Sequence, residues 1–168
     1  WWMHHADRAL LERHRDYITR LVDQIDLTVD SVGRFRANVF LDWPSSADKA
    51  GVRIGVQALT VWSMDAAAKL CHILGDSARE DKCRAVARRI SSHIATPKKL
   101  RQAAALMVIA GCMDAGDMAE RYMHGIDGFS TFYGYYMLEA LARAGRYDDA
   151  LDAISRYWGG MLDLGATT

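Results

Sequence analysis

Two kinds of apolar helical pattern alternate along most of this chain, and the alternation limits the chain to an all-α fold. Across residues 6–27, apolar side chains recur at spacings of three, four and seven on one face, with charged side chains on the other. Across residues 52–74 the pattern is apolar nearly all round. The first pattern predicts an outer helix at the surface, and the second predicts an inner helix that is covered on more than one side.

The same alternation continues toward the C-terminus. Residues 78–94 predict an outer helix, and Thr96-Pro97 is a typical cap and first position for an apolar inner helix through Ile109. A short polar helix over 114–123, an aromatic-rich inner helix over 131–144 and an amphipathic helix through Trp158 follow. Alternating inner and outer helical hairpins stack as an open solenoid or close into a two-layered ring. The uneven spacing of the inner helices favours the ring.

Length and charge indicate a single domain over residues 1–168, with 21 basic and 21 acidic residues. This balance argues against nucleic acid and against an anionic membrane surface as partners. No apolar run reaches the length of roughly 18 residues that a membrane span needs. No signal peptide pattern is present at the N-terminus, and the compartment stays open. Cys71, Cys83 and Cys112 lie among apolar helical neighbours and are predicted to be buried thiols.

One stretch departs from the helical pattern. Residues 38–44 alternate in polarity and end in proline, which predicts an extended segment leading into a turn. Asp42 and Trp43 stand at its end, between an outer and an inner helix. A carboxylate beside an indole offers a sugar an acceptor for hydroxyls and an apolar face for its ring. The alternative is that Asp42 caps a turn and Trp43 packs as a plug.

The C-terminal run GFSTFYGYYMLEALARAGRYDDALDAISRYWGGMLDLGATT resembles α-L-rhamnosidases, which are glycoside hydrolases with an (α/α)6 barrel. VFLDWP and RQAAALMVIAG resemble the same family in the same order, so the resemblance extends over the whole chain. It implies a partial (α/α)6 toroid and a carbohydrate substrate. It also implies hydrolysis of terminal L-rhamnose with inversion and without a cofactor.

Inverting hydrolysis uses two carboxyl groups roughly 6.5–9.5 Å apart. In the family the general base follows the GATT motif by a few residues, and the general acid precedes the position that matches Trp1. The resemblance therefore assigns no catalytic residue to residues 1–168. We expect this chain to be a fragment of the catalytic domain that does not hydrolyse glycosides by itself.

The resemblance also suggests residues that contact the sugar. Tyr133 lies at the start of the aromatic-rich helix, which borders the pocket in the family, although aromatic residues at helical spacing are more often packing residues. Trp158 and Thr167 flank the segment that delivers the catalytic base. They are expected either to shape the pocket or to serve as core and cap. With Asp42 and Trp43, these residues form the predicted substrate-binding set.

Other interpretations remain open. His4, His5 and His14 lack the further ligands of a metal site, so no metal is predicted. Another α/α-barrel exo-glycosidase or a polysaccharide lyase is the nearest alternative, and a lyase would be indicated by Arg and Lys clustered at the barrel mouth. From a different class, the hairpins are compatible with a protein-binding scaffold. Half a ring would leave inner helices exposed, which predicts a homo-oligomer.

Overall fold

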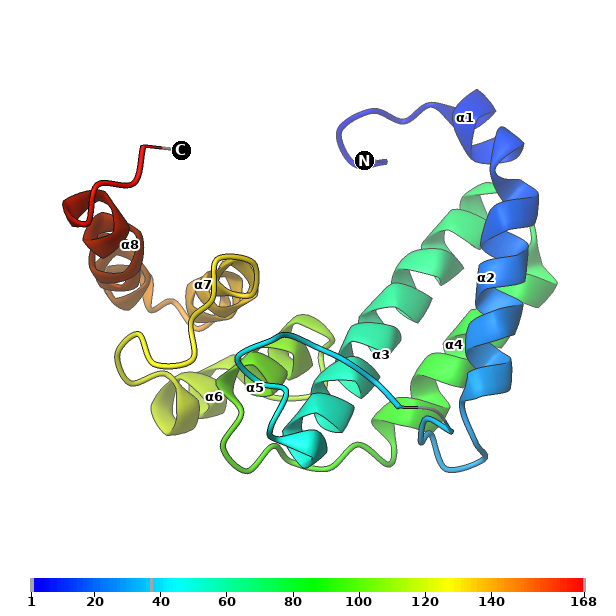
Figure 1. Cartoon of the computed structure of the whole chain (residues 1–168). Coiled ribbons are helices and arrows are strands. Elements are labelled where there is room, and N and C mark those ends of the chain that lie inside the picture. The colour runs from blue at the N-terminus through cyan, green and yellow to red at the C-terminus, as the bar shows by residue number, and fades with distance from the viewer. Residues whose placement is uncertain (1, 37, 168) are drawn as a thin grey trace. The chain divides into compact units, whose positions relative to one another are not determined.

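A computed structural model describes residues 2–36 and 38–167, and these are helical with no β-strand (Figure 1). In chain order the described helices are α1 (Arg8–Arg13), α2 (Arg15–Thr28), α3 (Lys49–Ile73), α4 (Ser77–Ser91), α5 (Arg101–Ile109), α6 (Ala115–Tyr122), α7 (Gly134–Arg143) and α8 (Tyr147–Asp163). The all-α prediction is confirmed for this part of the chain.

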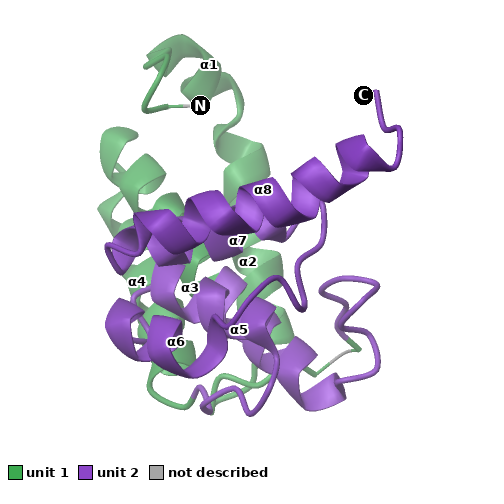
Figure 2. Ribbon diagram, turned by 90° about the vertical axis from the view of Figure 1, so that its left-hand side faces the viewer, with its two compact units in different colours: residues 1–38, 60–93 green, residues 39–59, 94–168 purple. Residues whose placement is uncertain are grey.

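The chain divides into two compact units (Figure 2). Unit 1 comprises residues 1–38 and 60–93, and unit 2 comprises residues 39–59 and 94–168. The boundary within α3 falls between Leu59 and Thr60. All the residues predicted to contact sugar belong to unit 2.

In unit 1, α2 lies beside α4 and three salt bridges join them. Lys82 Nζ lies 2.8 Å from Asp23 Oδ1 and 3.4 Å from Asp26 Oδ2. Arg89 Nη2 lies 2.7 Å from Asp26 Oδ1. The two acidic residues are on α2 and the two basic residues on α4, so the pairs fix the alignment of one helix on the other.

A tight turn after α2 approaches the backbone of α4. Asp30 Oδ1 accepts hydrogen bonds from the backbone N–H groups of Val32 and Arg34, and an isolated antiparallel bridge joins Val29 to Phe35. Gly33 has φ +72°, and a Cβ atom there would lie 2.7 Å from Ile90 Cα and 2.8 Å from the carbonyl oxygen of Arg89. Only glycine combines this conformation with so close an approach to a backbone.

Cys71 on α3 and Cys83 on α4 are buried in unit 1, as their apolar neighbours predicted. Burial, followed by the neighbouring Cys71, raises the pKa of the Cys83 thiol to about 12. Both therefore stay protonated at neutral pH. Cys112, in unit 2, is only half-buried.

The core of unit 2 is built around α5, which packs closely against α7. Every residue from Gln102 to Ile109 is buried, so α5 is covered all round, as expected of an inner helix. One face of α5, with Ala104 and Val108, packs with residues of α6, α7 and α8. The other, with Ala103 and Leu106, packs with Leu41, Val52 and Tyr133. α5 thus separates two apolar clusters within one unit.

Three predicted helix boundaries were wrong. The helix expected over residues 6–27 is two helices, α1 and α2, separated by the single non-helical residue His14. The helix expected to begin at Pro97 begins at Arg101, because buried Pro97 offers its carbonyl oxygen to the Tyr122 hydroxyl and its segment stays irregular. The helix expected from Thr131 begins at Gly134, after a turn in which the Ser130 carbonyl oxygen accepts from the Gly134 N–H.

Candidate functional site

The segment over residues 38–42 is neither helix nor strand and leads into a turn over residues 43–47, which confirms the predicted turn. Its side chains alternate in direction. Val39 and Leu41 pack into the core of unit 2 beside α5, whereas Phe40 and Trp43 are exposed. Trp43 breaks this alternation: it lies two residues after buried Leu41 and is nevertheless exposed, because the chain enters a turn over residues 43–47.

Asp42 connects this segment to α5 and to the turn before α7. Its Oδ2 atom accepts hydrogen bonds from Gln102 Nε2 at 3.0 Å and from Ser130 Oγ at 2.6 Å. Its Oδ1 atom accepts one from the Trp43 backbone N–H at 2.9 Å. The carboxylate therefore orders its own loop and draws together three parts of unit 2 that are far apart in sequence.

The Trp43 side chain is largely exposed to solvent, with a relative exposure of 80%. The Phe40 ring meets it edge to face, with the ring centroids 5.1 Å apart, and is itself 57% exposed. An edge-to-face partner restricts the orientation of the indole while leaving much of its surface in contact with water. Together the two rings form an exposed apolar pair on the loop that carries Asp42.

Tyr133 immediately precedes α7 and is 5% exposed. Its backbone N–H donates to Ser130 Oγ at 3.1 Å, so Ser130 links Tyr133 to Asp42. Burial, with smaller effects from Tyr136 and Asp42, raises the pKa of the Tyr133 phenol to about 12. Tyr133 is thus neutral at neutral pH and packs in the core, while Phe132 and Tyr135 beside it are exposed.

Trp158 lies on the other side of the start of α7. Its ring packs against Phe129 and Tyr157, with ring centroids 6.3 Å and 4.9 Å apart. A Cβ atom at Gly134 would lie 2.6 Å from the Trp158 ring. Trp158 therefore packs against the residues on either side of the Ser130–Tyr133 turn. Thr167 is exposed near the C-terminus, and no hydrogen bond or packing contact brings it to Asp42 or Tyr133.

The structure thus brings together four of the five predicted residues around one turn, with Trp43, Asp42 and Tyr133 connected through Ser130. Two important residues of the arrangement were not singled out. Gln102 carried a detectable signal, because it is a polar residue within an apolar inner helix. The Ser130 hydroxyl oxygen accepts from the Tyr133 N–H in the turn before α7, and its bond to Asp42 had no local signal in the sequence.

Three further observations bear on function. Among residues 2–36 and 38–167, no group of three or more His, Cys, Asp or Glu side chains is arranged to hold a metal ion. None of the helices in the same described part is long and apolar enough to cross a membrane. Comparisons with protein-family models, curated proteins and solved structures give no match to this chain.

Proposed function

We propose that this chain is part of an α/α-barrel carbohydrate-active enzyme similar to α-L-rhamnosidases, and that the surface around Asp42 and Trp43 binds a sugar. The inner and outer helices then form part of an (α/α)6 toroid, and the parent enzyme hydrolyses terminal L-rhamnose with inversion. The sequence assigns no catalytic carboxylate to this chain, so its own role in this proposal is binding.

The observation that carries the proposal is the exposed Trp43 indole on an ordered turn. A mobile exposed aromatic would lose conformational freedom on binding, whereas a turn held by hydrogen bonds and a ring partner presents its indole at little entropic cost. The flat apolar face of an indole is suited to the C–H face of a pyranose ring. Ligand sites combine such apolar surfaces with a few fixed polar groups.

Asp42 supplies the fixed polar group. A carboxylate has two oxygens and about four acceptor positions. Oδ2 accepts two hydrogen bonds from side chains, whereas Oδ1 accepts one from the Trp43 N–H. One acceptor position on Oδ1 therefore remains for a sugar hydroxyl beside the Trp43 ring. Asp42 in this arrangement orients the sugar, since its contacts are those of a structural acceptor.

The test is saccharide binding by the Trp43→Ala variant, measured by calorimetry with a rhamnose-terminated oligosaccharide. We expect the Kd to rise about tenfold, equivalent to about 1.4 kcal/mol, because the variant loses the stacking surface and keeps the fold. Tyr17→Ala is the control, since Tyr17 is a similarly exposed aromatic residue on α2 in unit 1. Equal affinity in wild type and Trp43→Ala, or no binding by the wild type, would contradict the proposal.

A protein-binding or self-associating role is the second candidate, and one observation favours it. Leu151, Ile154 and Leu162 are exposed along α8, at positions that share one face of the helix. The inner helix α5 is buried from Gln102 to Ile109 and offers no such face, whereas α8 does. Light scattering of the wild type and of Leu151→Glu tests this: a dimer that the substitution dissociates supports it, and a monomer at every concentration excludes it.

A further inference from the structure

The Trp43 indole is held mainly through the backbone of its turn. Its side chain is 80% exposed, and the Phe40 ring that meets it edge to face is exposed as well. The Trp43 backbone is bonded on both sides, because its N–H donates to Asp42 Oδ1 at 2.9 Å and its carbonyl oxygen accepts from the Ser46 N–H at 3.2 Å. The direction of the indole therefore depends on what fixes Asp42 and the turn.

Both oxygens of the Asp42 carboxylate take part in holding this turn. Oδ2 accepts from Gln102 Nε2 at 3.0 Å and from Ser130 Oγ at 2.6 Å, while Oδ1 accepts from the Trp43 N–H. All three groups are donors, and an ionised carboxylate, which only accepts, satisfies them together. The Ser45 hydroxyl adds a further link, since it donates to the Asp42 carbonyl oxygen at 3.0 Å. The turn is thereby tied to α5 and to the segment before α7.

The Ser130 hydroxyl connects Asp42 to the start of α7. Its Oγ atom accepts from the Tyr133 N–H at 3.1 Å, and the Ser130 carbonyl oxygen accepts from the Gly134 N–H at 2.8 Å. A hydroxyl has a single proton, and here Asp42 Oδ2 receives it. Removal of this hydroxyl would therefore detach Asp42 from the first turn of α7.

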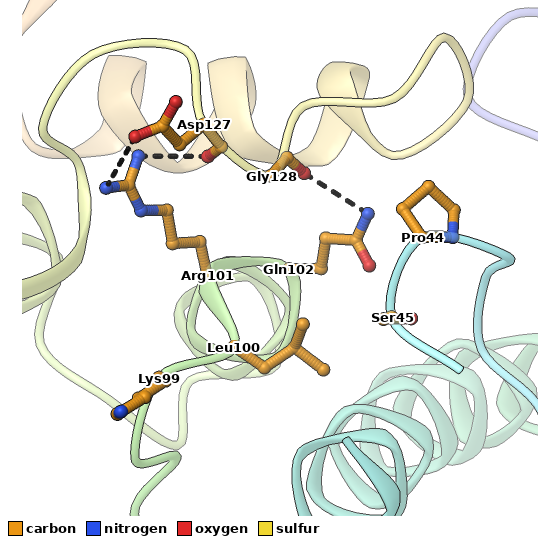
Figure 3. A pocket seen from close by; sticks show the side chains of 8 residues that line it. All are labelled: Pro44, Ser45, Lys99, Leu100, Arg101, Gln102, Asp127 and Gly128. Atoms are coloured by element: carbon orange, nitrogen blue, oxygen red, sulfur yellow. Dashed lines mark hydrogen bonds and ion pairs between the residues drawn. The ribbon is translucent and has the colours of Figure 1, made fainter. Parts of the chain in front are cut away.

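Gln102 holds Asp42 from α5, and its buried amide has one favourable orientation. Nε2 donates to Asp42 Oδ2 and, at 3.3 Å, to the Gly128 carbonyl oxygen (Figure 3). The opposite orientation would set Oε1 against these two acceptors. In the part of the chain that the structure describes, Oε1 has no hydrogen-bond partner and is closed off from solvent. The amide thus satisfies Asp42 while its own oxygen stays unpaired, which lowers stability.

Buried unpaired polar groups are rare, and folds that break this rule tend to do so at functional sites. We propose that Gln102 and Ser130 are positioning residues for Trp43: they hold the Asp42 carboxylate so that the turn presents the indole in one orientation. Both act through Trp43. The consequence for sugar binding rests on the proposed function, whereas the fixed orientation of the indole does not.

The first experiment follows the Trp43 indole without any ligand. The chain is labelled with fluorotryptophan, and the ¹⁹F resonance that is missing from Trp43→Phe belongs to Trp43. We expect Ser130→Ala and Gln102→Met to shift or broaden this resonance, while that of Trp62 in unit 1 stays in place. Ser130→Thr retains the hydroxyl and should restore the wild-type resonance. Ser155→Ala removes an exposed hydroxyl on α8 and is the matched control.

The second experiment measures a rhamnose-terminated oligosaccharide by calorimetry in a double-mutant cycle. Ser130→Ala is expected to raise the Kd about threefold, less than the roughly tenfold rise expected for Trp43→Ala. A residue that acts through the indole has no effect once the indole is gone. The double variant Trp43→Ala/Ser130→Ala should therefore bind with the same Kd as Trp43→Ala alone.

These measurements separate the inference from the proposed function. An unchanged Trp43 resonance in both Ser130→Ala and Gln102→Met overturns the positioning role, whether or not the chain binds sugar. Single effects on the Kd that multiply in the double variant overturn it as well. A displaced resonance in a chain without sugar affinity supports the positioning role and contradicts only the proposed function. Gln102→Met that displaces the resonance with no fall in the unfolding temperature supports it most directly, because loss of stability is then excluded as the cause.

Discussion

Gly134 shows how a single residue positions the candidate site. Trp158 packs where a side chain at Gly134 would lie, and the same glycine follows Tyr133 at the first position of α7. The absence of a side chain lets the indole reach the turn that carries Ser130. The position of Ser130 then determines whether its hydroxyl reaches Asp42.

The Gly134→Ala variant is predicted to lose about 1–3 kcal/mol of stability, the usual effect of overpacking a core. The new Cβ atom would lie 2.6 Å and 3.0 Å from two ring atoms of Trp158, so the ring must shift. Gly160→Ala is the matched control, because no atom lies within 4 Å of its Cβ position in α8. That variant should gain about 0.5–1 kcal/mol from the higher helix propensity of alanine. Urea unfolding measures both, and equal stability changes would contradict the packing described here.

Tyr133 is predicted to ionise later than the exposed tyrosines in a spectrophotometric titration. Its pKa rises from 10.0 to about 12 because the folded protein buries the neutral phenol. The folded state therefore binds a proton more tightly than the unfolded state, and this contribution to stability is complete below pH 10. It is lost as the pH rises toward about 12. Tyr133→Phe should abolish the late step, and a late step that persists in this variant would assign it to another tyrosine.

Among the helices, α2 and α4 show how charge fixes the alignment of one element on another. The Arg89 guanidinium, with Lys82 second, holds the pKa of Asp26 below its usual value of 3.8. Lys82 likewise lowers the pKa of Asp23. The ionised carboxylates are thus stabilised in the folded protein more than in the unfolded chain.

Asp26→Asn is predicted to cost about 1 kcal/mol at neutral pH, the upper range for a partly exposed pair. A carboxylate whose pKa is lowered on folding contributes stability above its unfolded pKa, and this contribution is lost as the pH falls through the folded pKa. The difference between wild type and variant should therefore shrink below about pH 3.8. Asp81→Asn removes an exposed charge on α4 and serves as control. A difference that stays constant across acid pH would exclude the ion pairs as its cause.

At the scale of the whole molecule, the resemblance to α-L-rhamnosidases assigns a sugar surface to this chain and assigns no catalytic carboxylate to it. We predict no turnover of an aryl α-L-rhamnoside by this chain, since inverting hydrolysis needs a general acid and a general base, and neither is assigned to it. Release of the aryl alcohol is measured against an active α-L-rhamnosidase as positive control. Turnover that increases in proportion to chain concentration would show that the chain holds its own catalytic residues.

Much of the helical architecture could be predicted from periodicity, because a buried helix face repeats along the sequence. The apolar residues of α5 and the one-sided pattern of α4 indicated their inner and outer character directly. The non-helical segment before Trp43 was predictable from its alternating polarity and its terminal proline, but the exposure of Trp43 departs from that alternation. Helix starts were less predictable, since the chain around Pro97 is held by the Tyr122 side chain rather than by local capping.

The sequence by itself determined the all-α class, the placement of the main helices and the non-helical turn that bears Trp43, because all three depend on neighbours along the chain. Only the tertiary structure decided that Asp42 meets Gln102 and Ser130, which lie 60 and 88 positions away. It also decided that the Gln102 amide oxygen is buried without a hydrogen-bond partner and that Tyr133 is buried. Hydrogen bonds between distant residues leave no periodic pattern in the sequence, and they form only when packing of the apolar clusters brings those residues together.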